Sequence, residues 1–306
     1  MVVVAALVVA LLLINGGGSE GGTATITVGN GPSAATFGAG AVWIPNQADG
    51  KVSRIDPGTN QVTDTIPVGA QPGGATFAEG AVWIVNGDNT VSRIDPASNR
   101  VTDTIGVGAR PVNAATGDGA VWVANEAART ISRIDTVTVQ VTATIDVRQN
   151  QNGRIASPSF GAGTLWVMDN SDRTVLQIDP ATNRVTGDPI EVGPLRIGAG
   201  GGLIASTFGA GALWVANSDD DTVSRIDPGT NRVIATIPLS SVPDAATFGA
   251  GAVWIAGGNE VSRIDPATNR VIARFDVGRL PLGVTFGDGA VWTANHDDGT
   301  VSRVQS

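Results

Sequence analysis

Seven tryptophans recur at nearly constant spacing along this chain of 306 residues. Each lies in a short apolar run such as AVWIPN, and neighbouring tryptophans are 38 to 48 residues apart. Self-similarity at a period of roughly 20–50 residues is typical of solenoids and propellers, so it constrains the fold before any single residue is considered. The seven positions are Trp43, Trp83, Trp122, Trp166, Trp214, Trp254 and Trp292.

Each repeat divides into four short runs that have the chemistry of β-strands. In the first copy these runs are 35–40, 41–46, 51–57 and 61–69, rich in Val, Ile and Thr with nearly alternating polarity. Gly, Asp-Pro and Asn stand between the runs, where turns need them. Four strands in a repeat of this length are typical of a propeller blade. The sequence therefore predicts an all-β, seven-bladed β-propeller with four antiparallel strands per blade.

The seventh repeat lacks a fourth strand, and a matching strand occurs near the other end of the chain. The last repeat finishes with its third strand at 300–306, whereas residues 23–29 read TATITVG, like the fourth strands elsewhere. We expect this N-terminal strand to complete blade seven and close the ring, which removes the open edges of a linear array. The propeller is thus expected over residues 23–306.

The first 22 residues form an apolar segment followed by a Gly-rich linker. Residues 2–14 are an unbroken run of Val, Ala, Leu and Ile. This run is shorter than the roughly 17–25 residues that span a bilayer, but it matches the apolar core of a secretory signal. A membrane tether, a truncated gene start, a buried strand and the missing remainder of a larger sensor protein are alternative interpretations. We expect a secreted, periplasmic or membrane-tethered protein, with a cytoplasmic location as the alternative.

The composition removes several kinds of active site. There is no Cys and no Tyr, and His296 is the only histidine, so thiol chemistry and most acid–base catalysis lack the residues they need. The net charge of −9 disfavours a sequence-independent grip on nucleic acid. Nearly all aromatic residues are repeat positions, which leaves none to stack on bases. We expect no nucleic-acid partner.

The turns of the repeat divide between two faces of the predicted ring. Gly-x-Gly and Asp-Pro turns are almost constant, and the alternation of hairpins places them together on one face. The other face, called the variable face below, carries the hairpins between second and third strands and the links between blades. Two of these links are enlarged, 149–158 and 194–205. Because function usually lies on loops held by a rigid scaffold, we expect any site on the variable face.

Arginines outside the repeat concentrate in the links, whereas acidic residues concentrate in the hairpins. Arginine suits bidentate recognition of carboxylate or phosphate. An Arg-lined mouth around the axial opening therefore favours a small anionic ligand or a protein partner, with solvated loop charge as the alternative interpretation. The candidate ligand-binding residues are Arg110, Arg148, Arg154, Arg196, Asp244, Arg279 and His296.

Three further patterns have structural interpretations. The Asp-rich hairpins 217–222 and 295–300 offer oxygen ligands for Ca²⁺, but Asp, Asn and Gly are also what tight hairpins require. We expect no cofactor and no metal, and keep Ca²⁺ as the alternative. The Arg-x-Asp of the repeated SRIDP runs is interpreted as a ladder of opposite charges on one strand face. The tryptophans are interpreted as packing between blades.

The repeat resembles the YVTN-type seven-bladed propeller repeat of bacteria, as in AVWVANSDDDTVSRIDPGTNRVIATIPL over 212–239. It is also similar to propellers related to streptogramin (virginiamycin B) lyase. The lyase resemblance implies a metal-assisted site with a histidine pair and a glutamate, and His296 alone cannot supply that pair. We therefore predict a non-catalytic binding or scaffold propeller that engages a protein or a small anionic ligand. A lyase- or hydrolase-like enzyme with its site at the axial mouth is the alternative.

Overall fold

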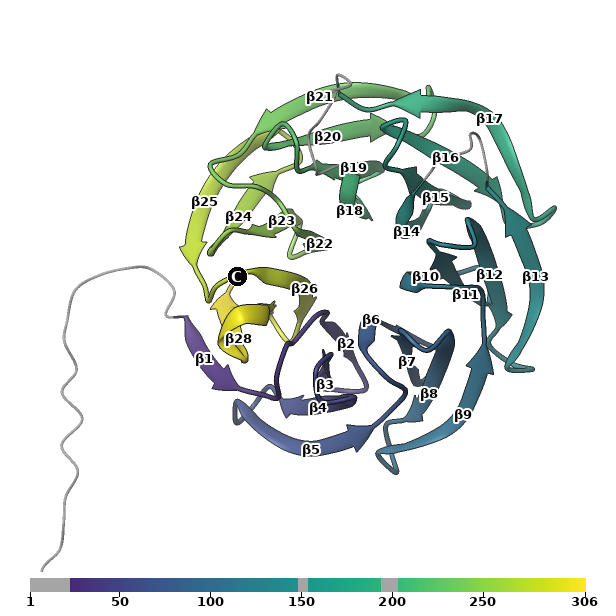
Figure 1. The fold of residues 1–306 in the computed structure, drawn as a ribbon. Helices are drawn as coiled ribbons and strands as arrows, with labels where there is room; N and C mark the ends of the chain where they lie inside the picture. Colours follow the sequence, from purple (N-terminus) through teal and green to yellow (C-terminus); the bar gives the residue numbers. More distant parts are fainter. Residues whose placement is uncertain (1–22, 148–153, 194–202) are drawn as a thin grey trace, which may run out of the picture.

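The computed structural model describes residues 23–147, 154–193 and 203–306. They form seven four-stranded antiparallel sheets arranged around a central opening (Figure 1). The apolar segment 2–14 and the arginines Arg148 and Arg196 lie outside the described residues. The predicted all-β architecture of seven blades is confirmed.

Six blades are built from consecutive strands, ordered from the central opening to the rim. Blade 1 contains β2 (Thr36–Gly38), β3 (Ala41–Asn46), β4 (Lys51–Asp56) and β5 (Gln61–Pro67). Blade 2 contains β6 (Pro72–Ala78), β7 (Ala81–Asn86), β8 (Thr90–Asp95) and β9 (Arg100–Gly106). Blade 3 contains β10 (Pro111–Gly117), β11 (Ala120–Asn125), β12 (Thr130–Asp135) and β13 (Gln140–Asp146). Blade 4 contains β14 (Ile155–Gly161), β15 (Thr164–Asp169), β16 (Thr174–Asp179) and β17 (Arg184–Glu191). Blade 5 contains β18 (Leu203–Gly209), β19 (Ala212–Asn217), β20 (Thr222–Asp227) and β21 (Arg232–Pro238). Blade 6 contains β22 (Ala245–Gly249), β23 (Ala252–Gly257), β24 (Glu260–Asp265) and β25 (Arg270–Asp276).

Blade 7 joins the two ends of the domain. It contains β26 (Pro281–Gly287), β27 (Ala290–Asn295) and β28 (Thr300–Gln305), and its outer strand is β1 (Ala24–Thr27). Strand β1 pairs antiparallel with β28, and Ile26 lies opposite Val301. Ile26 is buried in the same apolar cluster as Val301. The N-terminal strand therefore closes the ring, as the sequence predicts.

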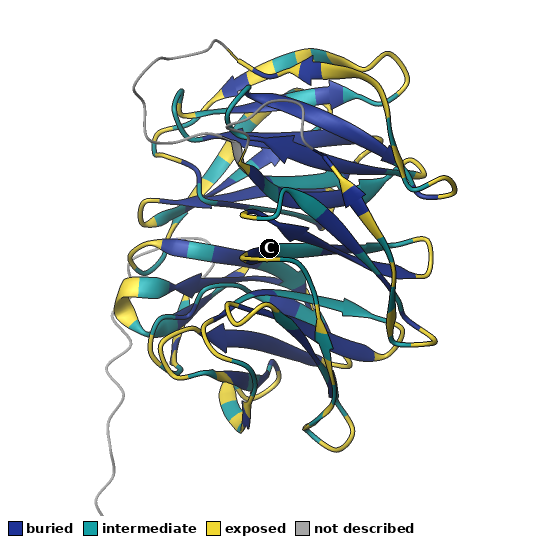
Figure 2. Cartoon of the chain, turned by 45° about the vertical axis from the view of Figure 1, so that its right-hand side comes forward, coloured by how far each residue is buried: buried dark blue, intermediate teal, exposed yellow. Residues whose placement is uncertain are grey.

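The core consists of one apolar cluster between each pair of neighbouring blades. Trp43 of blade 1 packs with Val82 and Ile84 of blade 2, and the same arrangement repeats around the ring. All seven indole rings are at most 1 % exposed. Each indole N–H donates to the carbonyl five residues earlier, as Trp43 does to Gly38 at 3.0 Å. The tryptophans are inter-blade packing, and Figure 2 shows the buried strands with exposed loops at both faces.

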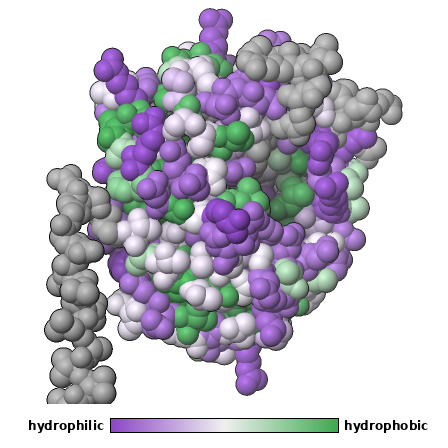
Figure 3. Space-filling view, turned by 60° about the vertical axis from the view of Figure 1, so that its left-hand side comes forward, coloured by the Kyte–Doolittle hydropathy of each residue, from purple (hydrophilic) through white to green (hydrophobic). Residues whose placement is uncertain are grey.

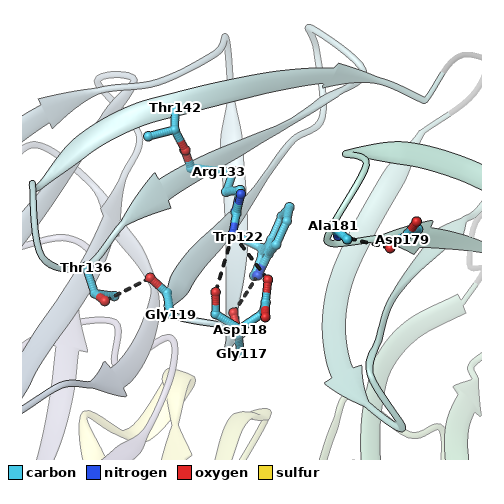
Figure 4. A network of polar contacts seen from close by, with 9 residues as sticks. All are labelled: Gly117, Asp118, Gly119, Trp122, Arg133, Thr136, Thr142, Asp179 and Ala181. Atoms are coloured by element: carbon cyan, nitrogen blue, oxygen red, sulfur yellow. Dashed lines mark hydrogen bonds and ion pairs between the residues drawn. The ribbon is translucent and has the colours of Figure 1, made fainter.

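The arginines of the SRIDP runs have a role beyond the one predicted. Arg133 lies opposite Trp122 in the strand register, with its guanidinium 5.1 Å from the indole centroid. It forms an ion pair with Asp118 at 3.2 Å, as Figure 4 shows, and not with Asp135 two residues further along. Asp135 instead accepts hydrogen bonds from Thr138 and so closes the next turn. Arg133 still attracts the Asp135 carboxylate and helps to lower its pKa, but as the last of several effects after the turn hydrogen bonds. The predicted Arg-x-Asp attraction is therefore present, and an Arg–Trp stack and a turn cap are added to it.

Blade 4 departs from this pattern because Gln177 stands where the other blades carry arginine. Gln177 lies opposite Trp166 and is 9 % exposed. Stacking of arginine on tryptophan is found in the other six blades. Nothing in the structure explains the glutamine.

The outer wall of the ring presents mainly polar side chains. Figure 3 shows one side, where apolar patches are small and separated by hydrophilic residues. Within the described ranges, the exposed large hydrophobic residues on the outer strands are Ile234 of β21 and Ile272 of β25. The wall therefore offers no broad apolar surface on this side, and the polar loops of the variable face remain the place for a site.

Candidate functional site

Residues at the start of the first strand of each blade, or just before it, line an axial cavity of about 320 Å³. These residues follow directly after the links between blades, so the cavity belongs to the variable-face half of the ring. Almost all of them are Gly, Ala, Ser, Pro, Val or Leu. Asn113 supplies an amide, and among the described residues of the lining Asp244 is the one that is ionisable.

Polar side chains tie neighbouring blades together around this cavity. Ser33 donates to the Pro72 carbonyl at 2.9 Å, which joins blades 1 and 2. The Asn113 amide donates to the Ser157 hydroxyl at 3.3 Å, and the Ser206 hydroxyl donates to the Ser157 carbonyl at 3.1 Å. These contacts link blades 3, 4 and 5 to one another along the cavity wall.

The structure places the predicted site residue Asp244 directly before β22. Its backbone N–H donates to the Ala256 carbonyl at 2.8 Å, so the residue is fixed to the adjacent strand. Burial raises the pKa of the Asp244 carboxyl, although a hydrogen bond from the Gly258 N–H acts in the opposite direction. Within the described ranges, no cationic side chain forms an ion pair with it.

Arg110 and Arg154 come together on a single carboxylate. The Nε of Arg110 lies 3.1 Å from Oε2 of Glu126, and the Nε of Arg154 lies 2.5 Å from Oε1. Glu126 is 9 % exposed, whereas the two arginine side chains are 65 % and 61 % exposed. Two links and one hairpin thus build a cluster with a net charge of +1, called the Arg110–Arg154 pair below.

Arg279 and His296 form local contacts in blade 7. The Arg279 N–H and Nε each donate to Asp298 at 2.7 Å, which neutralises the guanidinium. Both hydrogen bonds lower the pKa of the Asp298 carboxyl, and the one from the backbone N–H has the larger effect. His296 begins the short 3₁₀ turn η1 (His296–Asp298), and its Nδ1 lies 3.3 Å from the Pro32 carbonyl. The structure does not bring either residue to the Arg110–Arg154 pair.

The structure contains a buried ion cluster between blades 4 and 5 that the sequence analysis did not predict. Arg173 contacts Asp219 at 3.1 Å and Asp220 at 2.7 Å, and its side chain is only 4 % exposed. The signal in the sequence was the opposite charge of two neighbouring hairpins, but hairpin charge alone does not reveal which pairs meet. Because Arg173 bonds both aspartates, their carboxylates already have a cationic partner.

The described residues contain neither a cluster of metal-ligating side chains nor a membrane-spanning helix. Over residues 23–147, 154–193 and 203–306, no three His, Cys, Asp or Glu side chains gather as metal ligands would. Across the same ranges, every helix is too short or too polar to cross a bilayer.

The comparisons with known proteins agree with this fold. A family model described as "Domain of unknown function (DUF5074)" matches residues 19–173. No curated protein matches the sequence significantly.

Solved structures show the same architecture at low sequence identity. Hydrazine synthase of Kuenenia stuttgartiensis has a TM-score of 0.77 and 18 % identity, covering 92 % of this chain and 97 % of that one. A streptogramin B lyase has a TM-score of 0.79 and 17 % identity, covering 93 % and 97 %. A computationally designed protein, Ika8, has a TM-score of 0.65 and 18 % identity, covering 90 % and 83 %. The resemblance to lyase-like propellers is thus confirmed for the fold, while the YVTN resemblance stays a prediction.

Proposed function

The chain belongs to the family described as domain of unknown function DUF5074, and we propose that it is a binding propeller for a small anionic ligand. The ligand's carboxylate or phosphate group binds the Arg110–Arg154 pair on the variable face. The scaffold itself is non-catalytic and holds these side chains in place.

The observation that carries this proposal is the sharing of Glu126 by two guanidinium groups. Each guanidinium makes its shortest contact with the carboxylate through Nε. Among the described residues Glu126 is the one acidic partner of both arginines, so their outer Nη groups are positioned to recognise a second acceptor. One buried carboxylate holds two like charges together, which leaves the pair with a net charge of +1. Arg279, by contrast, is neutralised by Asp298. Charge-assisted, bidentate hydrogen bonds from arginine are the standard means of recognising carboxylate and phosphate.

The enzymatic alternative has weaker support. The lyase resemblance implies a histidine pair, and His296 is the single histidine of the sequence. Its Nδ1 lies against the Pro32 carbonyl, at the link to blade 1. Because the streptogramin B lyase structure is 17 % identical in sequence, the similarity supports the fold and not the activity. We therefore favour binding over catalysis.

We also propose that the protein acts outside the cytoplasm, exported or tethered through its apolar residues 2–14. Cell fractionation of a C-terminally tagged protein tests this. Recovery of uncleaved protein in the soluble cytoplasmic fraction contradicts it.

Calorimetric titration with inorganic phosphate and citrate tests the binding site. We expect Arg110→Ala/Arg154→Ala to weaken binding by roughly tenfold or more, since charged hydrogen bonds contribute about 1.5–3 kcal/mol each. The matched control is Arg184→Ala/Arg232→Ala, which removes two exposed arginines from the outer strands of blades 4 and 5, away from Glu126. Equal affinity of both double variants and the native protein contradicts the proposal. Binding of a Glu-rich peptide but of neither small anion identifies a protein partner instead.

A further inference from the structure

The axial cavity has the size and the wall of a small-molecule site. Its volume of about 320 Å³ lies at the lower end of the roughly 300–1,000 Å³ typical of ligand pockets. Every blade contributes the start of its first strand, so the wall is made of paired backbone. The small side chains leave space at the axis, and Val112, Leu282 and Val284 provide an apolar portion.

Asp244 is the one acidic residue among the described residues that line this cavity. The residue occupies the same position in blade 6 that Gly73 occupies in blade 2 and Leu282 in blade 7. Figure 1 shows β22, which follows it, on the opposite side of the central opening from β10. Within the described residues the carboxylate has a hydrogen bond from the Gly258 N–H but no cationic partner. A half-buried carboxylate without a counter-charge is unfavourable, so a cation in the cavity would stabilise it.

We propose that the axial cavity binds the ammonium group of a small organic amine through Asp244. An ammonium group has three N–H donors and no acceptor. Asp244 accepts one of them, and the hydroxyls of Ser33, Ser157 and Ser206 supply further acceptors in the same lining. The amine's hydrocarbon portion packs against the apolar wall.

The lining discriminates between an amine and the other cations that a carboxylate attracts. Ca²⁺ takes six to eight oxygen ligands, commonly several of them carboxylates, and Asp244 supplies the one carboxylate among the described lining residues. An organic ammonium needs one carboxylate and benefits from apolar surface, which this wall has. The inference is separate from the proposed anion site, because the residues and the ligand charge differ.

Titration with n-butylammonium chloride, followed by saturation-transfer NMR, tests the proposal. Asp244→Asn keeps the shape of the residue and removes its charge. Gly73→Val narrows the cavity with Asp244 intact, since a Cβ built on Gly73 meets nothing closer than the Val112 carbonyl at 3.9 Å. Gly106→Val is the matched control, because Gly106 is on outer strand β9 and a Cβ there meets nothing within 4 Å.

The native protein and Gly106→Val should bind the amine equally, at constant ionic strength. Asp244→Asn and Gly73→Val should each bind roughly tenfold more weakly or not detectably. Butyrate, which has the same hydrocarbon chain and the opposite charge, should not bind in the cavity. Unchanged amine binding by Asp244→Asn, displacement of the amine by equimolar sodium, or no binding by the native protein would each overturn the proposal.

Discussion

The ring of Phe248 occupies the space beside Gly209 where any other residue would carry its Cβ. A Cβ built on Gly209 would lie 2.1 Å from the Phe248 Cγ, far inside contact distance. Six such contacts link neighbouring blades. In the remaining interface the glycine position is Ala78 and the phenylalanine position is Thr116, so both partners differ together. The six pairs are Gly38–Phe77, Gly117–Phe160, Gly161–Phe208, Gly209–Phe248, Gly249–Phe286 and Gly287–Phe37.

Gly209→Ala should therefore destabilise the protein, by about 1–3 kcal/mol, because overpacking forces the phenylalanine to move. Adding Phe248→Thr recreates the natural Ala78–Thr116 combination, so the double variant should be more stable than the sum of the single effects. Urea unfolding of all four proteins gives the coupling free energy, expected at roughly 1 kcal/mol or more. Strict additivity of the two substitutions would show that the residues do not exclude each other.

The turn between β12 and β13 has a conformation unsuited to its sequence. Val139 has a φ of 57°. Blades 1, 2, 4, 5 and 6 carry asparagine at the corresponding position of this turn, with φ between 52° and 57°. A left-handed conformation costs a β-branched residue about 1–2 kcal/mol, and asparagine tolerates it. Val139→Asn should raise the free energy of unfolding by about 1 kcal/mol. The control is Val141→Asn, two residues later, where φ is not positive, and this variant should be less stable than the native protein. If Val139→Asn also lowers the free energy of unfolding, the backbone of Val139 is not strained.

The turn aspartates should make the fold sensitive to acid. The Thr59 N–H and hydroxyl, both donating to Asp56, hold the pKa of that carboxyl below its usual range, and Thr138 does the same for Asp135. A lowered pKa in the folded state stabilises the protein above the ordinary carboxyl pKa. That stabilisation is lost as pH falls through the folded-state pKa.

Asp56→Asn/Asp135→Asn tests this sensitivity, because the hydrogen bonds that these side chains accept from Thr59, Val137 and Thr138 all go to Oδ1, which asparagine retains. The difference in unfolding free energy between the native and double-variant proteins should be constant near neutrality. It should shrink below about pH 4, where the native carboxylates become protonated. Parallel stability curves over the whole acid range would contradict the role of ionisation.

The repeat made the fold predictable, whereas the site depends on contacts between different repeats. Seven copies of one strand pattern define the blade count, and the TATITVG strand predicts closure because it matches a local pattern. Glu126 is 16 residues from Arg110 and 28 from Arg154, in a different loop from each. Their meeting follows from the spacing of blades 3 and 4, which residue type and position do not encode. Sequence alone therefore selected both arginines but did not reveal the carboxylate that pairs them.

Asp244→Asn should stabilise the ligand-free protein at neutral pH. Burial raises the pKa of Asp244 in the folded state, so the folded protein retains this proton to higher pH than the unfolded chain does. The unfavourable contribution appears as pH rises through the unfolded-state pKa and is complete above the folded-state pKa. The variant should therefore match the native protein in acid and exceed it at pH 7, in urea unfolding. A variant less stable than the native protein at pH 7 would indicate that the carboxylate is satisfied in the free protein.

Ring closure by β1 is tested by two nested truncations. Removal of residues 1–22 leaves β1 intact, whereas removal of residues 1–29 deletes it together with the buried Ile26. The second truncation exposes the edge of β28 and part of the cluster around Trp292 and Val301. Loss of a buried isoleucine alone costs about 2–5 kcal/mol, so the longer truncation should lower the melting temperature by many degrees. The shorter one should leave melting unchanged, and equal melting of the two truncated proteins would show that β1 does not hold the ring closed.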